Sequence, residues 1–446
     1  MRWPILAALL LAIAGPAGAE PVDSSASAPD GPKLSAKLRV EWGVETRSGD
    51  SQKLELGLEP RLEMPLPDRF RLEAIARLRA DAYDRLGFTG QHEVAPASRS
   101  LVLADHVDLG LRELYVEGSL GPVWLRAGKQ QIVWGEADGL KLLDVVDPQE
   151  FREFILPDFD ESRIPLWSLN AEVPIEKAHL QVIWLPDPST DDFPEPGKRF
   201  AFTTPLLLGP PAPPGVPVRV RHVDRPDDAL ADSDAGARLS GMWHGWDLTA
   251  NYLYHFSDVP LPFHQVSFAG GLPSVVVRPG YERSHLLGGS CSSAFGDLTV
   301  RCEVSYNLDF HSPAKSPPDR DGVVHADELS YVVGLDWYHF AETLLSVQLF
   351  QSWALQNASQ LERDRLETNL TVLARRQLLN ERLTLETMWI QNLNRGDGLV
   401  RPKIRYELRD RLFVWLGFDV FYGKSRGVFG QFDRNDRAVL GFEWGI

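Results

Sequence analysis

The sequence has no hydrophobic run long enough to cross a membrane as a helix, which excludes a helical integral membrane protein. The longest apolar run, from Ile5 to Ala14, lies at the N-terminus and is too short to span a bilayer. It follows Arg2 and precedes the small residues Ala17-Gly18-Ala19, an arrangement typical of a secretory signal peptide. We therefore expect an exported protein in which residues 1–19 are the signal peptide and residues 20–33 a flexible N-terminal segment.

Cysteine is almost absent, basic residues are outnumbered, and the common catalytic motifs are missing. The two cysteines in 446 residues have no Cys-x-x-Cys spacing and no histidine cluster nearby, which argues against a metal site. A formal net charge of −16 without a basic patch argues against nucleic acid as a partner. Gly-x-Ser-x-Gly, His-Glu-x-x-His and phosphate-binding loops do not occur. We therefore expect no enzyme activity, no catalytic residues, no metal and no cofactor.

The two cysteines flank a turn-like sequence. Cys291 and Cys302 stand at similar distances from the centre of Ala294-Phe295-Gly296-Asp297. In an antiparallel hairpin that turns there, the two residues are directly opposite each other, close to the separation that a disulfide needs. Exported proteins meet an oxidising compartment. We predict a disulfide between Cys291 and Cys302, with two free thiols as the alternative.

What the sequence has in abundance is a two-residue period. From Leu34 to Val44 every second residue is apolar, and the residues between are mainly charged. The same alternation recurs at 54–63, 70–81, 401–408 and 438–446. Successive side chains of a β-strand point to opposite faces, so each of these strands has one apolar and one polar face. A nearly continuous apolar face opposite a charged face is typical of a barrel in lipid.

Short and long connections alternate along the chain, as in outer-membrane barrels. We expect short turns near 65–69, 121–122, 174–177, 244–245, 295–297, 339–342, 379–381 and 409–411. We expect longer loops at 87–107, 135–165, 186–233, 257–282, 309–326, 355–364 and 424–434. Short turns of such barrels face the periplasm and long loops face the exterior, which places both chain ends on the periplasmic side.

The fold class predicted from this pattern is all-β, with a single antiparallel transmembrane β-barrel over residues 34–446. The connections give about 18 strands, or 16 if the weak hairpin at 167–185 does not form. A soluble β-sandwich or propeller would also alternate, but the chain has no composition break between smaller domains and no repeat of propeller length.

The loop 135–165 is the best candidate for a pore constriction, because it combines carboxylates with an apolar stripe able to pack against a wall. We expect it to fold inward. Its candidate constriction residues are Glu136, Asp138, Asp144, Asp147, Glu150, Arg152, Glu153, Asp158, Asp160 and Arg163.

A basic wall is expected opposite this loop. If the barrel closes from its last strand to its first, the inward faces of six contiguous strands hold many cations. They are Lys37, Arg39, Arg61, Arg71, Arg77, Arg79, Arg401, Lys403 and Arg405. An acidic loop facing a basic wall would create a transverse field that selects and orients solutes. The alternative is that these cations are simply ion-paired with carboxylates such as Glu55 and Glu73 on the same faces.

Two regions resemble a known family. Residues 126–139 read Arg-Ala-Gly-Lys-Gln-Gln-Ile-Val-Trp-Gly-Glu-Ala-Asp-Gly, and Asp-Val-Val-Asp-Pro follows at 144–148. This resembles the strand and following loop of an uncharacterised Gram-negative outer-membrane porin-like β-barrel family, similar to alginate-export and substrate-specific porin barrels. The C-terminus also resembles an outer-membrane assembly signal, although Ile446 stands where an aromatic residue is usual and Trp444 lies two residues earlier.

The pattern and the resemblance together predict a porin-like channel in the bacterial outer membrane for passive passage of small polar solutes, either selective or unselective. Its expected partners are outer-membrane lipid, small solutes and the barrel-assembly machinery. Two alternatives stay open at this point. One is the outer-membrane component of an export or lipid-transport system, with a plugged lumen and a periplasmic transport partner. The other is a structural or adhesive barrel whose loops are the functional surface.

Overall fold

The structure is a computed structural model that describes residues 31–83, 86–87, 93–104, 106–212, 214–269, 272–315 and 321–446. The expected signal peptide at 1–19 and residues 20–30 lie outside the described residues. The first described strand begins at Lys33, the last residue of the expected segment 20–33.

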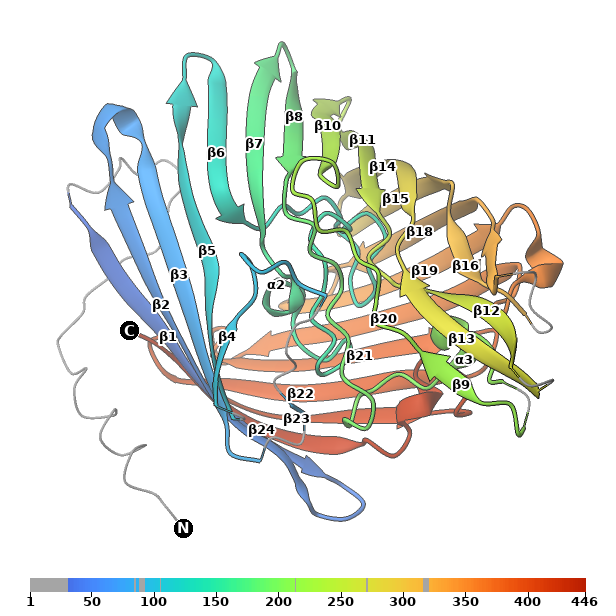
Figure 1. Ribbon diagram of the computed structural model, residues 1–446. Coiled ribbons are helices and arrows are strands. Elements are labelled where there is room, and N and C mark those ends of the chain that lie inside the picture. The colour runs from blue at the N-terminus through green and yellow to red at the C-terminus, as the bar shows by residue number, and fades with distance from the viewer. Residues whose placement is uncertain are drawn as a thin grey trace.

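Eighteen antiparallel strands close into one β-barrel (Figure 1). They are β1 (Lys33–Glu45), β2 (Ser51–Pro65), β3 (Arg71–Asp81), β5 (Val107–Leu120), β6 (Val123–Gln130), β7 (Leu166–Ile175), β8 (Ala178–Leu185), β10 (Asp234–Trp243), β11 (Trp246–Phe256), β14 (Arg283–Phe295), β15 (Leu298–Leu308), β18 (Glu328–Trp337), β19 (Thr343–Ala354), β20 (Leu366–Leu378), β21 (Leu383–Asn392), β22 (Gly398–Arg409), β23 (Leu412–Tyr422) and β24 (Arg437–Gly445). The last strand pairs with the first, with Lys37 opposite Gly445. The predicted all-β fold is confirmed, and because β7 and β8 form the hairpin at 167–185, the count of 16 is wrong.

The barrel is apolar outside and polar inside. On β19, the outward Val347 and Leu349 are 44% and 36% exposed, whereas the alternating Ser346 and Gln348 are 1% and 2% exposed. This is the reverse of a soluble protein, in which large apolar side chains face the core. The exterior therefore suits lipid and the interior suits water and charge, which places the chain in the bacterial outer membrane.

The two ends of the barrel differ, as the sequence predicts. Every predicted short turn joins neighbouring strands at one end, here called the turn end. The long connections lie at the other end, here called the loop end (Figure 1). Both ends of the barrel chain lie at the turn end, where the backbone N–H of Ala36 donates to the carbonyl of Ile446 over 2.9 Å.

Several long connections contain strands or short helices of their own, which the sequence predicted only as loops. They hold β4 (Leu101–Ala104), α2 (Phe159–Ser162), α3 (Pro205–Leu208), β9 (Val218–Val220), β12 (Leu261–Ala269), β13 (Leu272–Gly280), β16 (His311–Pro313) and β17 (Val323–His325). Single-turn helices occur at η1 (Pro67–Arg69), η2 (Ala358–Gln360) and η3 (Gly430–Phe432). Within the described parts of the chain, no helix has both the length and the apolar character needed to cross a membrane.

Cys291 and Cys302 are directly opposite each other on β14 and β15, as the hairpin register predicts. They share the outward faces of their strands with Leu287 and Val304, each 46% exposed, and so face lipid. Both are free thiols in the structure. Their disulfide therefore stays a prediction.

A glycine in β6 allows two strands to approach closely, and this gives a test of the fold. Gly128 has φ +133°, and a Cβ there would lie 2.2 Å from the carbonyl oxygen of Leu114. We expect Gly128→Ala to lower the free energy of unfolding by at least about 1–3 kcal/mol, because the backbone is strained and the neighbouring strand must move. Urea unfolding followed by tryptophan fluorescence measures this.

The matched control is Gly57→Ala on β2, where the nearest atom to an added Cβ is 3.9 Å away. We expect this variant to unfold like the unmodified protein. Equal midpoints for the two variants would contradict the close approach at Gly128.

Candidate functional site

The connection between β6 and β7, residues 131–165, lies inside the barrel and is here called the lumen loop (Figure 1). It extends four residues before the predicted loop 135–165. Its first part is attached to β15 and β19: the carboxylate of Glu303 accepts the backbone N–H of Glu136 over 2.5 Å and that of Leu143 over 3.2 Å. The side-chain oxygen of Gln348 accepts the backbone N–H of Asp138 over 3.1 Å.

Glu136 and Asp138 therefore lie on the β15–β19 side of the lumen, away from the expected basic wall. The Asp138 carboxylate pairs with Arg301 at 2.5 Å and accepts from the Gln348 amide over 2.9 Å. The carbonyl of Glu136 accepts from the same arginine over 2.7 Å. This cation was not among the predicted wall residues.

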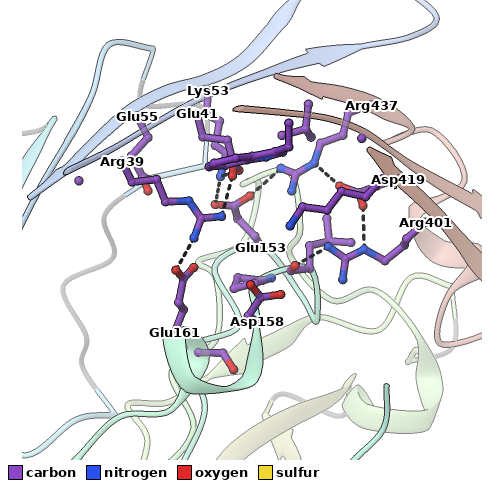
Figure 2. A pocket seen from close by; sticks show the side chains of 18 of the residues that line it. Arg39, Glu41, Lys53, Glu55, Glu153, Asp158, Glu161, Arg401, Asp419 and Arg437 are labelled. Carbon is purple, nitrogen blue, oxygen red and sulfur yellow. Dashed lines mark hydrogen bonds and ion pairs between the residues drawn. The ribbon is translucent and has the colours of Figure 1, made fainter. Parts of the chain in front are cut away.

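The second part of the lumen loop reaches the opposite side, where Glu153 is the centre of a buried charge network (Figure 2). One carboxylate oxygen lies 2.7 Å from the ammonium of Lys53 on β2, and the other lies 2.6 Å from the guanidinium of Arg437 on β24. Lys53 also pairs with Glu41 at 2.5 Å, and Arg437 with Asp419 at 2.8 Å. Although burial alone would raise it, these cations hold the pKa of Glu153 well below its usual range.

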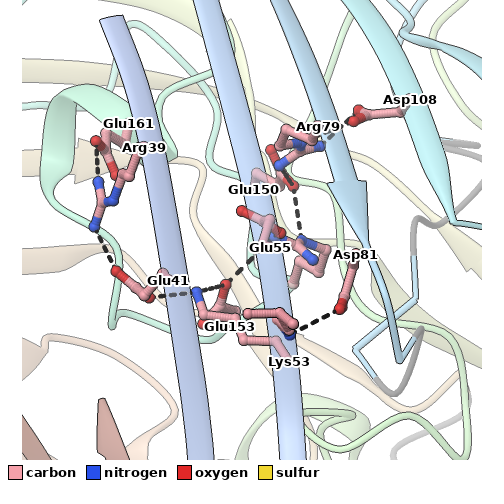
Figure 3. A network of polar contacts seen from close by, with 12 residues as sticks. Arg39, Glu41, Lys53, Glu55, Arg79, Asp81, Asp108, Glu150, Glu153 and Glu161 are labelled. Atoms are coloured by element: carbon pink, nitrogen blue, oxygen red, sulfur yellow. Dashed lines mark hydrogen bonds and ion pairs between the residues drawn. The ribbon is translucent and has the colours of Figure 1, made fainter. Parts of the chain in front are cut away.

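Glu150 connects the lumen loop to β3 (Figure 3). Its carboxylate lies 2.6 Å from Arg79 and 3.1 Å from Arg77, and Arg79 also pairs with Asp108 on β5 at 2.8 Å. Burial disfavours the charged carboxylate, but the guanidinium groups of Arg79, Arg77 and Arg152 outweigh it and hold the pKa of Glu150 at about 2.

The last part of the lumen loop, around α2, contacts β1. Glu161 forms an ion pair with Arg39 and lies 3.5 Å from Lys37. Burial nevertheless raises the pKa of Glu161 above its usual range. The carbonyl of Asp160 accepts from Arg112 on β5.

The remaining predicted constriction residues have different roles. Arg152 pairs with Glu55 on β2, and Asp158 lines the cavity described below. Arg163 pairs with Asp144 at 2.7 Å within the loop itself. Asp147 is buried and accepts the backbone N–H of Ile132 over 2.7 Å.

An aromatic cluster anchors the same part of the loop near the loop end of the barrel. Phe154 is 4% exposed, and its ring centroid lies 4.8 Å from that of Phe432 and 6.1 Å from that of Phe421 on β23. Phe200, from the connection between β8 and β10, packs against Phe432 at 5.5 Å. Apolar packing thus fixes the loop next to its charge network, and burial of each phenylalanine contributes roughly 1.5–3 kcal/mol.

The predicted basic wall exists on contiguous strands, but nearly all its cations are ion-paired. Besides the pairs above, the wall contains Lys37–Glu59, Arg39–Glu41, Arg61–Glu73, Arg71–Glu117, Arg401–Asp419 and Arg405–Glu443. Among the described residues, only Lys403 of the predicted set has no carboxylate within 4 Å; its ammonium lies 5.4 Å from the ring centroid of Trp415. The basic wall in this structure therefore agrees better with the ion-paired alternative than with a wall of free cations.

A cavity of about 150 Å³ lies between the lumen loop and this wall (Figure 2). Cations and carboxylates both line it, together with the indole of Trp415. Trp415 lies inward, over Gly441, where an added Cβ would be 1.9 Å from the ring. Arg39 and Lys403 lie at 5.1 Å and 5.4 Å from its ring centroid, so the indole is placed between two wall cations.

Three residues of the Glu153 network were not predicted from the sequence: Lys53, Asp419 and Arg437. Their signal was present, because each stands at an inward position of an alternating strand. This signal was not decisive, because alternation shows which face of a strand a residue occupies but not at which level along the barrel the lumen loop contacts that face.

A second buried cluster joins three connections at the loop end. Asp191, from the connection between β8 and β10, accepts the backbone N–H of Gln149 over 2.7 Å, and its own N–H donates to the carbonyl of Asp258 over 3.3 Å. Burial raises the pKa of Asp191 to about 7. Burial and the neighbouring Asp191, Asp234 and Asp147 raise that of Asp258 well above its usual range, with Lys141 the opposing cation.

A closed barrel with an apolar exterior, a charged interior and an inward-folded loop defines a porin-like outer-membrane protein. The model of the family described as "Protein of unknown function (DUF1302)" matches residues 78–426, so the chain belongs to that family. A comparison with curated protein sequences finds no match.

Solved structures of similar fold are outer-membrane porins. Acinetobacter baumannii OccAB3 is 12% identical with a TM-score of 0.52, over 93% of this chain and 99% of that chain. Pseudomonas aeruginosa OccK2 (OpdF), in complex with glucuronate, is 11% identical with a TM-score of 0.51, over 93% and 98%. Pseudomonas aeruginosa OccK8 (OprE) is 11% identical with a TM-score of 0.50, over 93% and 98%. At these identities the likeness shows the fold alone.

The Glu153 network gives a prediction about loop attachment. Glu153→Gln leaves the buried Lys53 and Arg437 without their shared carboxylate, and we expect a loss of about 3–5 kcal/mol in the stability of the attached loop. Limited proteolysis of the refolded protein should then cut within 131–165 much faster than in the unmodified protein.

The control is Glu386→Gln, which removes a half-exposed ion pair with Arg375. We expect an effect of at most about 1 kcal/mol there. Equal protection of the loop in both variants would show that the aromatic cluster alone holds it.

The Asp191–Asp258 cluster gives a pH prediction. Because the pKa of Asp191 is raised to about 7 in the folded state, the folded protein binds more protons than the unfolded chain between about pH 4 and pH 7. Stability from this cluster is therefore present at acidic pH and falls as the pH rises through that window. We expect Asp191→Asn, which keeps the acceptor for Gln149, to reduce the difference between the unfolding temperatures at pH 5 and pH 8.

Asp410→Asn, in an exposed turn, is the control and should leave the pH dependence unchanged. An Asp191→Asn variant that keeps the full pH dependence would assign it to another group.

Proposed function

We propose that this outer-membrane barrel is a channel for passive diffusion of small polar solutes, with the lumen loop as its constriction. The observation that carries the proposal is the path of the loop, which is attached to β15 and β19 on one side and to β1–β3 and β24 on the other. A segment attached on both sides of the lumen narrows whatever path runs through it. Barrels of this strand number commonly leave an aqueous channel.

The arrangement of charges supports a channel that selects solutes by how they orient in the cavity rather than by the net charge of the solute. Wall cations on β1, β3 and β22 face carboxylates of the loop across a cavity that both line. Opposed charges at a narrow point align a dipolar solute and attract either end of it. Lys403 and the indole of Trp415 are the part of this lining that is open to a solute carboxylate or other anion, because Lys403 has no ion-pair partner among the described residues.

The first test is single-channel conductance of the refolded protein in a planar bilayer, beside a variant in which Gly-Ser-Gly replaces residues 138–160. The replacement is compatible with closure, because Gln130 and Leu166, which flank the loop, are paired on neighbouring strands. We expect stable steps from the unmodified protein and several-fold larger steps from the shortened one. The reversal potential in a KCl gradient should shift toward cation preference in Lys403→Gln and not in Lys177→Gln, a turn residue.

Three results would contradict the proposal in different ways. No conductance from the intact protein but large steps after shortening would indicate a plugged barrel, as an export or lipid-transport component would have. No conductance from either folded variant would leave the loops as the functional surface. Steps of equal size from both variants would show a channel whose constriction lies elsewhere.

A further inference from the structure

The lipid-facing surface has a groove across β19–β22, near the turn end of the barrel. Its volume is about 250 Å³, and its lining includes Thr343, Ala374, Arg376, Leu385, Thr387 and Pro402. These six residues belong to outward faces. The alternate positions Arg375, Glu386 and Lys403 also border the groove. Glu386 and Lys403 line the lumen cavity as well, and Arg375 pairs with Glu386. Leu385 is itself 36% exposed.

The groove arises from a row of small side chains between rows of larger ones. Ala374, Thr387 and Pro402 are neighbours across β20, β21 and β22. The row above them, toward the loop end, contains Trp389, and the row below contains Arg376 and Leu385. A groove one row of side chains wide, in a surface that faces hydrocarbon, has a shape that fits a single acyl chain.

Arg376 gives the groove a charged end. It lies two residues before the end of β20 at Leu378, and the next outward row toward the turns contains Tyr406. In the described parts of the chain, no carboxylate lies within 4 Å of its guanidinium. An arginine on a lipid-facing strand is unfavourable at the bilayer centre and tolerated near the interface, where its long side chain reaches the headgroups. The fork of a guanidinium fits a phosphate with two parallel hydrogen bonds.

We propose that this groove is a binding site for one phospholipid of the leaflet at the turn end, with an acyl chain along Ala374, Thr387 and Pro402 and the phosphate on Arg376. Two observations carry this site independently of the channel function: an apolar groove open to hydrocarbon, and an unpaired cation at headgroup height. A second copy of the chain could also cover a groove. The charge favours the lipid, because a phosphate supplies the anion that Arg376 lacks.

The test is native mass spectrometry of the folded protein in detergent, titrated with phosphatidylglycerol. We expect one lipid to stay bound at low concentration. Arg376→Gln should weaken this binding by about tenfold, the value of one charge-assisted contact. Ala374→Leu should weaken it similarly by filling the groove while the arginine is retained.

Two matched controls separate the site from general effects. Arg405→Gln removes a lumen-facing arginine of β22 that does not line the groove, and Ala237→Leu enlarges an outward alanine on β10. Both should retain the lipid. Heat-dependent migration of each variant on a gel reports whether the barrel is folded.

Equal binding by all folded variants would overturn the proposal. So would loss of an oligomer, rather than of a lipid, in Ala374→Leu, because the groove would then be an interface between copies. Displacement of phosphatidylglycerol by millimolar inorganic phosphate alone would also overturn it, since it would reduce the site to a simple anion contact without an acyl groove.

Discussion

Closure of the sheet is the constraint on which the rest of this structure depends. In hydrocarbon no water is available to backbone N–H and C=O groups, so β24 must return to β1 and leave no edge. Once closed, the sheet has its apolar side chains outside, and the charged positions of every strand are directed into one narrow space. Charges crowded there must find partners, which explains why the wall cations are nearly all paired and why carboxylates of the lumen loop are drawn among them.

The lumen loop is held by two kinds of contact with different consequences. The phenylalanine cluster around Phe154 contributes burial, which is favourable and undemanding in geometry. The pairs made by Glu150 and Glu153 contribute little net stability, because desolvation offsets their attraction, but a displaced loop would leave several buried charges unpaired. Packing thus keeps the loop inside the barrel, and the charge network determines where it lies there.

Strand positions were predictable from the sequence because alternation is a local property: the faces of β1, β2, β22 and β24 follow directly from it. The order of the wall strands also followed, since short turns force neighbours to pair. The contacts of the lumen loop were not predictable, because the path of a long connection depends on side chains far away in sequence. Glu136 and Glu153 look alike in the sequence, yet they lie on opposite sides of the lumen. The hairpin of β12 and β13 was not predicted, because these strands belong to a small sheet separate from the barrel and do not have the alternation of a lipid-facing strand.

The Glu153 network also crosses the seam between the two ends of the chain. Lys53 comes from the second strand and Arg437 from the last, so the two cations flank Glu153 only after β24 has paired with β1. Until that moment the carboxylate lacks one of its partners, and a closure shifted by one residue would turn Arg437 toward lipid. Complete pairing of Glu153 in the lumen loop and correct pairing of β24 with β1 therefore depend on each other. The residue that positions the lumen loop in the closed barrel therefore has both its cations only when the seam is in this register.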